Sequence, residues 1–177
     1  MRRTINIMVS VAAALLLSAC KLNFGLFESS YTFNGASINY DEVKTIQIND
    51  FPNRASYVWG PMAGMFNNEL RDKFASQTRL TSVNRNGDWK IEGEITRYDQ
   101  RNKGVSSEGY SAQTELSITV NVRFTNNKNH QEDFERQFTA SQSYDTTQSL
   151  NSVQEELVTV MITDICDQIF NATAVNW

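Results

Sequence analysis

The sequence predicts an α+β fold, a two-layer sandwich in which two helices pack on one face of a mostly antiparallel sheet of four to five strands. The expected elements run in the order strand, helix, several strands and helix. Each clear strand alternates apolar and polar residues, whereas strands of a parallel sheet covered on both faces are continuously apolar. The helices are therefore expected to cover only one face of the sheet.

The first strand and the first helix are expected between residues 44 and 74. Residues 44–48 alternate polar and apolar side chains, which is typical of a half-buried strand. Pro61 then marks the start of a helix, because its missing N–H would be unpaired in a first turn anyway. The apolar residues that follow at intervals of three and four form one helix face, made of Met62, Met65, Phe66, Leu70 and Phe74. This face could line a ligand groove, but packing in the core is the simpler interpretation.

A run of strands follows the helix. Residues 79–83 predict a short strand, and Asn86-Gly87 predicts a hairpin turn after it, because both residues tolerate positive φ. Residues 89–96 alternate apolar and polar side chains in the next strand. Residues 98–112 contain two glycines and mixed charge, so we expect them to form a loop.

The chain ends with two further strands and a helix. Residues 116–124 alternate strictly, and a polar turn leads from them to the last strand, residues 134–140. Ser152 and Glu155 fit a capping box at the start of the final helix. The apolar stripe of this helix is broad, which predicts burial on more than one side, and Cys166 within it is interpreted as a small core residue.

The first twenty residues predict a lipoprotein signal. Two arginines precede a largely apolar run over residues 5–17, which is the arrangement of a secretory signal. This run is shorter than the roughly 20 apolar residues that span a bilayer. Leu17-Ser18-Ala19-Cys20 resembles a bacterial lipobox, so we expect residues 1–19 to be removed as a signal peptide and Cys20 to be lipidated. The alternative is an ordinary signal peptide cleaved after Ala19.

The predicted lipid on Cys20 determines the expected domain organisation and location. Two or more acyl chains are enough for stable anchoring without a spanning helix. Residues 20–41 are interpreted as the lipidated N-terminus and a tether, and residues 42–177 as a single domain. Lys21, rather than Asp, follows the cysteine, which by resemblance to known lipoproteins favours the outer membrane, with the domain on the periplasmic side.

Composition and motifs argue against several classes of protein. The formal net charge of −4 is not that of a strongly basic nucleic-acid binder, and two cysteines with one histidine cannot build a Cys/His zinc site. No Gly-rich phosphate loop, HExxH or GxSxG motif is present. Glu92 with Glu94, and Asp164 with Asp167, could form carboxylate pairs, but such pairs on exposed elements are usually solvated. We therefore expect no enzyme, no metal and no cofactor apart from the covalent lipid on Cys20.

The polar face of the predicted sheet carries little charge. Asn, Gln, Ser and Thr together make up a third of the chain, and Ser117, Thr119 and Asn121 lie on the polar side of the clearest strand. The simple interpretation is a solvated sheet face. The more specific one is a face adapted to a polar interior, such as the lumen of a large membrane barrel.

An ordered set of segments resembles the LptE family of lipopolysaccharide-assembly lipoproteins, in a divergent branch. The segments are YTFNGASI (31–38), KTI (44–46), FPNRA (51–55), SQTRL (76–80), GDW (87–89), EGEITRY (92–98), DQIFN (167–171) and NW (176–177). The family's fold, two helices on one face of a sheet, matches the fold expected from the residues.

The resemblance implies a non-enzymatic plug inside an LptD-like β-barrel, which helps that barrel assemble and assists lipopolysaccharide transport and insertion into the outer leaflet. If lipopolysaccharide is contacted, Arg97, Arg101 and Lys103 around the predicted loop are the candidates, although ordinary surface charge is the simpler interpretation. An alternative function is a periplasmic lipid- or glycolipid-binding lipoprotein without a barrel partner. An envelope enzyme is the least supported hypothesis, because it rests only on carboxylates such as Glu92 and Glu94.

Overall fold

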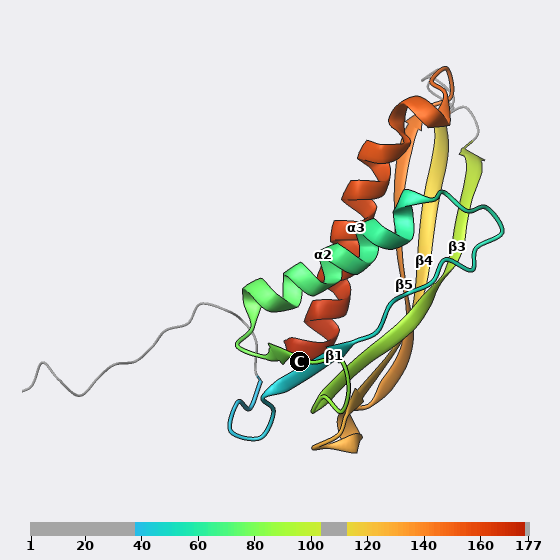
Figure 1. Ribbon diagram of the computed structural model, residues 1–177. Coiled ribbons are helices and arrows are strands. Elements are labelled where there is room, and N and C mark those ends of the chain that lie inside the picture. Colours follow the sequence, from blue (N-terminus) through green and yellow to red (C-terminus); the bar gives the residue numbers. More distant parts are fainter. Residues whose placement is uncertain (1–37, 104–112, 176–177) are drawn as a thin grey trace, which may run out of the picture. The chain divides into compact units, whose positions relative to one another are not determined.

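A computed structural model of the chain describes residues 38–103 and 113–175 (Figure 1). The described residues belong to one compact unit, Asn34–Trp177. The predicted signal peptide, Cys20, most of the tether and the last two residues lie outside the described part of the chain. Among the helices that are described, none combines the length and apolar character needed to cross a bilayer.

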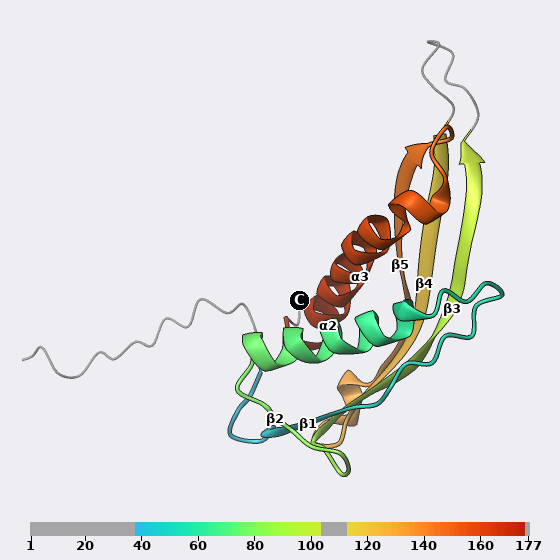
Figure 2. The same cartoon turned by 45° about the horizontal axis from the view of Figure 1, so that its top comes forward.

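The structure contains a five-stranded sheet and two long helices. The elements are β1 (Thr45–Ile48), α2 (Pro61–Gln77), β2 (Thr81–Ser82), β3 (Trp89–Lys103), β4 (Gln113–Asn126), the 3-10 helix η2 (His130–Glu132), β5 (Phe134–Asp145) and α3 (Leu150–Ala174). The strand order is β2-β1-β3-β4-β5. The β3–β4 and β4–β5 pairs are antiparallel, while β1 runs parallel to both β2 and β3. Both helices lie on the same face of the sheet (Figure 2), so the predicted fold class is confirmed.

The core lies between the helices and the inner face of the sheet. The predicted apolar face of α2 is buried, with Met62, Phe66 and Leu70 fully inaccessible and Phe74 1 % exposed. Phe74 contacts Phe170 of α3, with ring centroids 5.3 Å apart. These side chains therefore fill the core and do not line an open ligand groove. The broad stripe predicted for α3 is likewise buried, including Cys166.

The predicted Asn86-Gly87 hairpin is wrong, because β2 and β3 are not neighbours. β1 lies between them and pairs with both, so that Ile46 is level with Ser82 on one side and Trp89 on the other. Asn86 does adopt a positive φ of 55°, but its turn carries the chain past β1 rather than back along β2. A side chain at Gly87 would come within 2.6 Å of the backbone nitrogen of Gln47 in β1, so the turn needs glycine there.

The predicted loop over residues 98–112 is also wrong in its first part. Residues 98–103 continue β3, paired with β4 as far as Lys103 opposite Gln113, and residues 104–112 lie outside the described part. The register shifts between Ile95 and Arg97. Because of this irregularity the next buried residue after Ile95 is Tyr98, three positions on, so the alternation that marked the strand in the sequence breaks there.

The capping box predicted for the final helix is wrong. α3 begins at Leu150 after the N-cap residue Ser149, so Ser152 lies inside the first turn. The Ser152 hydroxyl donates a hydrogen bond to the Ser149 carbonyl oxygen at 2.7 Å. The strand before this helix, β5, is also longer than predicted, because it continues to Asp145. The helix therefore starts three residues earlier than its capping motif indicates.

Candidate functional site

The outer face of the sheet, opposite the helices, is formed by alternate residues of β3, β4 and β5. The register places Arg97 opposite Thr119, which lies opposite Thr139. Apolar side chains from the same strands point the other way, into the core. Because α2 and α3 both cover the inner face (Figure 2), the outer face is the side of the sheet that no described long helix covers.

A row of hydroxyl groups lies on β4 and the edge strand β5 of this face. Ser117 and Ser141 are joined by a hydrogen bond of 2.8 Å between their hydroxyl oxygens, and Thr119 and Thr139 by one of 3.0 Å. Cross-strand pairs of this kind stabilise a sheet while leaving its surface uncharged. We name these four residues the hydroxyl row. Ser117 and Thr119 were expected on the polar face, whereas Ser141 was not, because β5 extends beyond the predicted strand end at residue 140.

An ion pair between Arg123 and Glu135 lies at one end of the hydroxyl row. Arg123 donates to one carboxylate oxygen of Glu135 through both Nε and Nη2, at 3.1 and 2.8 Å. Asn121 donates to the other oxygen at 3.1 Å. Hydrogen bonds from Asn121 and Arg123 lower the pKa of the Glu135 carboxyl, and the same carboxylate raises the pKa of Arg123. The charges at this end therefore largely neutralise each other.

The three basic residues predicted around a loop instead lie on one strand. Arg97, Arg101 and Lys103 all project from the outer face of β3. Six residues of strand separate the first from the last, a span of about 20 Å, so the three do not converge on one point. Lys103 forms an ion pair with Glu115 and donates to the Ser143 hydroxyl at 3.2 Å. Arg97 and Arg101 are exposed and form no ion pair with any described residue.

Of the first carboxylate pair considered for catalysis, Glu92 is engaged in structural contacts. Glu92 forms an ion pair of 2.7 Å with Lys90 and accepts a hydrogen bond of 3.2 Å from Asn49. Glu92 and Glu94 line a shallow, open hollow of 320 Å³ on the outer face.

The two aspartates of α3 also have partners. Asp167 pairs with Lys73 of α2, and Asp164 accepts a hydrogen bond of 3.2 Å from Gln168. In the part of the chain that the structure describes, no group of three or more His, Cys, Asp or Glu side chains is placed to hold a metal ion.

A comparison with known families matches most of the chain. The model of the LptE family, described as lipopolysaccharide-assembly, matches residues 43–173. The chain belongs to the LptE family. The match covers β1 to nearly the end of α3, which includes the whole outer face of the sheet. Among curated proteins, none matches this LptE-family sequence.

Solved structures are similar to this LptE-family chain at low sequence identity. A protein from Xanthomonas campestris is 9 % identical, with a TM-score of 0.53 over 73 % of this chain and 84 % of its own. A hypothetical protein from Chlamydia trachomatis is 11 % identical, with a TM-score of 0.50 over 76 % of this chain and 98 % of its own. The rare lipoprotein B from Shewanella oneidensis is 14 % identical over 71 % of this chain and 92 % of its own, with a TM-score of 0.47.

Proposed function

We propose that this LptE-family chain is an outer-membrane lipoprotein, anchored through Cys20, whose domain sits on the periplasmic side as a plug in an LptD-like β-barrel. In this role it assists barrel assembly and the transport and insertion of lipopolysaccharide into the outer leaflet. Family membership supports the assembly role. The observation that supports the docking surface is the hydroxyl row on the outer face of the sheet.

The hydroxyl row suits a partner whose wall is polar. Barrel interiors are lined by polar side chains, and the accessible hydroxyls of Ser117, Thr139 and Ser141 can exchange hydrogen bonds with such a wall. Thr119 is 5 % exposed and contributes through its hydrogen bond to Thr139. The charged groups at the margins of the face, Arg123 with Glu135 and Lys103 with Glu115, are already paired. Arg97 and Arg101 on β3 are the exception, because they are exposed and form no ion pair with a described residue, so a docked barrel wall would need acceptors opposite them.

The alternative function, a lipid or glycolipid carrier without a barrel partner, would need an open apolar cavity. It was based on the Met62, Met65 and Phe66 face of α2. Met62 and Phe66 are fully buried in the core, so this face offers no groove to an acyl chain. The packing therefore favours the barrel-plug function.

The test is to purify the full lipoprotein from membranes in mild detergent and identify what accompanies it. We expect a large β-barrel protein in stoichiometric amount. Thr139→Lys adds a charge to the hydroxyl row on the edge strand β5 and should reduce barrel recovery at least fivefold. Thr159→Lys makes the same change at an exposed position of α3 and should leave the recovery of the barrel unchanged. Recovery of the wild-type lipoprotein alone would overturn the proposal, and equal recovery with both variants would overturn the assignment of the outer face.

A further inference from the structure

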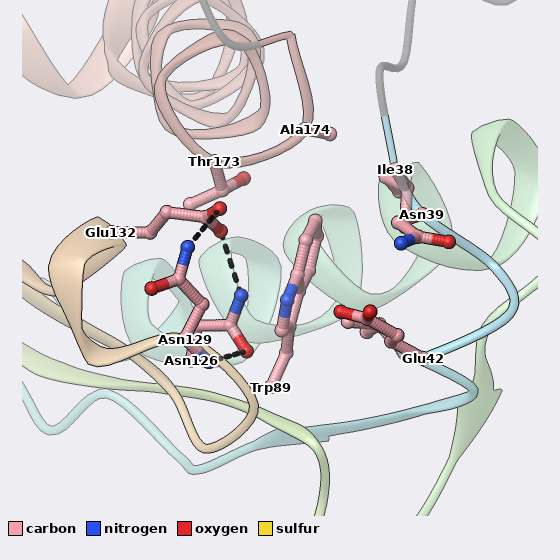
Figure 3. Close-up of a pocket in the computed structure, with 10 residues that line it drawn as sticks. Ile38, Asn39, Glu42, Trp89, Asn126, Asn129, Glu132, Thr173 and Ala174 are labelled. Atoms are coloured by element: carbon pink, nitrogen blue, oxygen red, sulfur yellow. Dashed lines mark hydrogen bonds between the residues drawn. The ribbon is translucent and has the colours of Figure 1, made fainter.

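Polar side chains line a pocket of 260 Å³ at the end of α3, and they bind one another (Figure 3). Glu132 accepts hydrogen bonds from the side-chain amides of Asn126 at 2.7 Å and Asn129 at 2.9 Å. This cluster therefore stabilises the turn after β4. Unpaired groups lie instead along the last part of β3, residues 97–103.

The last part of β3 is an open edge of the sheet. β1 pairs with β3 only at residues 89–91, and the segment that follows β1 reaches as far as a single bridge between Asn53 and Ile95. Beyond Ile95, β4 is the only described strand that pairs with β3. Figure 2 shows β3 continuing past the segment that joins β1 to α2. An open edge of this kind can pair with a strand of another chain.

The register of β3 assigns the direction of the backbone groups along this edge. Ile95 directs its backbone away from β4, because its N–H donates to the Pro52 carbonyl at 3.0 Å and its carbonyl accepts the Arg54 N–H at 2.8 Å. Alternate residues of a strand share this direction, and the register shift between Ile95 and Arg97 moves it by one position. The residues whose backbone N–H and C=O groups point outward without a described partner are therefore Tyr98, Gln100 and Asn102.

Two arginines without ion pairs lie on this part of β3. Arg97 and Arg101 are exposed, and neither forms an ion pair with a described residue. They are four positions apart, a span of about 13 Å, and Asp99 lies between them opposite Ser117. A strand added to this edge would place one side chain beside each of these three charged residues on the outer face. Carboxylates beside the arginines and an uncharged residue beside Asp99 would therefore complement the edge.

Exposed apolar side chains lie on the inner side of the same edge. The Tyr98 side chain is buried, and the Tyr57 ring stacks on it with centroids 5.5 Å apart and planes at 20°. Tyr57 is still 50 % exposed, and its neighbour Val58 is 59 % exposed. Because successive side chains of a strand point to opposite faces, an added strand could cover this ring with apolar side chains that alternate with its carboxylates.

Strand addition would use all of these features, whereas a lipid phosphate would use only the arginines. A phosphate diester accepts hydrogen bonds but has none to donate to the carbonyl groups of Gln100 and Asn102. We propose that this edge binds an extended segment of a partner protein, with two carboxylates four positions apart beside Arg97 and Arg101 and apolar side chains toward Tyr57. The proposal requires neither the hydroxyl row nor a barrel, so its test is separate from that of the proposed function.

The test titrates the full ¹⁵N-labelled lipoprotein in detergent with a capped peptide, Ser-Glu-Val-Thr-Val-Glu-Ser. We expect the amide signals of Gln100 and Asn102 to shift saturably, with a dissociation constant on the order of 100 μM. Their exchange with water should slow at least fivefold at saturation. The amides of Asp99 and Arg101 point to β4, so they should be protected already and change little. This alternation is specific to strand pairing, and Ser141 on the other edge strand should be unaffected.

Matched variants separate the contribution of charge from that of the backbone. A peptide with glutamine in place of both glutamates should bind at least fivefold more weakly at low salt. This difference should disappear in the double variant Arg97→Gln with Arg101→Gln and persist in Arg85→Gln, a change at an exposed turn residue. Gln100→Pro removes an outward N–H and should weaken binding at least tenfold relative to Gln100→Ala. Both changes at Gln100 lose the same hydrogen bond from the Tyr144 hydroxyl, so they form a matched pair.

A short-chain phosphatidylglycerol added to the detergent micelles tests the lipid alternative. It should leave the exchange of the Gln100 and Asn102 amides unchanged. Slowing of both amides by this lipid as strong as that by the peptide would overturn the proposal. No saturable shift with the peptide up to about 5 mM, protection without the alternation along β3, or equal binding of the glutamine peptide to the wild type would each overturn it as well.

Discussion

Asp88 and Thr45 bind each other reciprocally at the point where β1 and β3 begin. The Thr45 hydroxyl donates to Asp88 Oδ2 at 2.9 Å and accepts the backbone N–H of Asp88 at 2.9 Å. The same carboxylate oxygen accepts the backbone N–H groups of Thr45 at 3.0 Å and Lys44 at 2.9 Å. Its other oxygen pairs with Lys128 at 3.0 Å. One side chain therefore fixes β1, a strand of only four residues, to the longest strand of the sheet.

We predict that Asp88→Asn lowers the free energy of unfolding by about 1–3 kcal/mol, because it removes the charge from these hydrogen bonds. The hydrogen bond from the Lys44 N–H, followed by those from Lys128 and Thr45, holds the pKa of the Asp88 carboxyl well below its usual range. The folded-state pKa thus lies below the unfolded value of about 3.9. The stabilisation is therefore complete above about pH 5 and is lost as the pH falls.

The measurement for Asp88 is urea unfolding between about pH 2 and pH 7. Asp88→Asn should show a smaller loss of stability on acidification than the wild type. Asp41→Asn, a nearby exposed carboxylate outside this network, should leave both the stability and its pH dependence nearly unchanged. Identical pH profiles for wild type and Asp88→Asn would contradict the assigned role.

Gly93→Ala should destabilise the fold by about 2–3 kcal/mol or more, through crowding in the core. A Cβ at Gly93 would lie 2.0 Å from the carbonyl oxygen of Asn121 and 2.6 Å from Cε1 of Phe51. Gly64→Ala is the matched control, because a Cβ there meets nothing within 4 Å. Alanine in the interior of α2 should stabilise the chain by about 0.5–1 kcal/mol. The Tm of Gly93→Ala should therefore lie below that of the wild type, and the Tm of Gly64→Ala should lie above it.

Cys166 should not react with a maleimide reagent in the folded protein. Burial raises the pKa of its thiol, and the thiolate is the reactive form. The side chain is fully buried, so the reagent also lacks access. Labelling followed by mass spectrometry should show modification of Cys166 only at denaturant concentrations that unfold the domain. Rapid labelling under native conditions would mean that α3 opens locally.

Arg97→Gln and Arg101→Gln should each weaken binding of lipopolysaccharide to the full lipoprotein by about two- to fivefold, if the outer face of β3 contacts its phosphates. The expected effect is small because these side chains are exposed and surface ion pairs contribute at most about 1 kcal/mol. Arg85→Gln, an exposed arginine of the turn before β3, is the control. Binding that is unchanged in all three variants at low salt would leave these arginines as ordinary surface charge.

The fold class was predictable because the strongest patterns are local. The alternation in β4 and the apolar face of α2 follow from side-chain periodicity alone, and both are confirmed. The position of β1 was not predictable in the same way, because nothing in four alternating residues identifies their partners. The irregularity between Ile95 and Arg97 hid the rest of β3 by breaking its alternation. The order and type of the elements could thus be predicted from the sequence, whereas the pairing of the strands could not.

The candidate site was likewise predictable in its local pattern and not in its strand pairing. Ser117 and Thr119 could be placed on a polar sheet face from their spacing, but Thr139 and Ser141 become their partners only through the β4–β5 register.

The position of β1 has a consequence for how the chain folds. The β3, β4 and β5 strands form a meander of successive antiparallel neighbours, whereas β1 must join across a separation of more than forty residues. Distant pairings form more slowly than nearby ones, so we expect the meander to assemble first and β1 to join last. Until β1 joins, the first residues of β3, residues 89–91, form an open strand edge that another unfolded chain could pair with. Because Asp88 fixes β1 at this point, we expect Asp88→Asn to prolong that exposure during refolding.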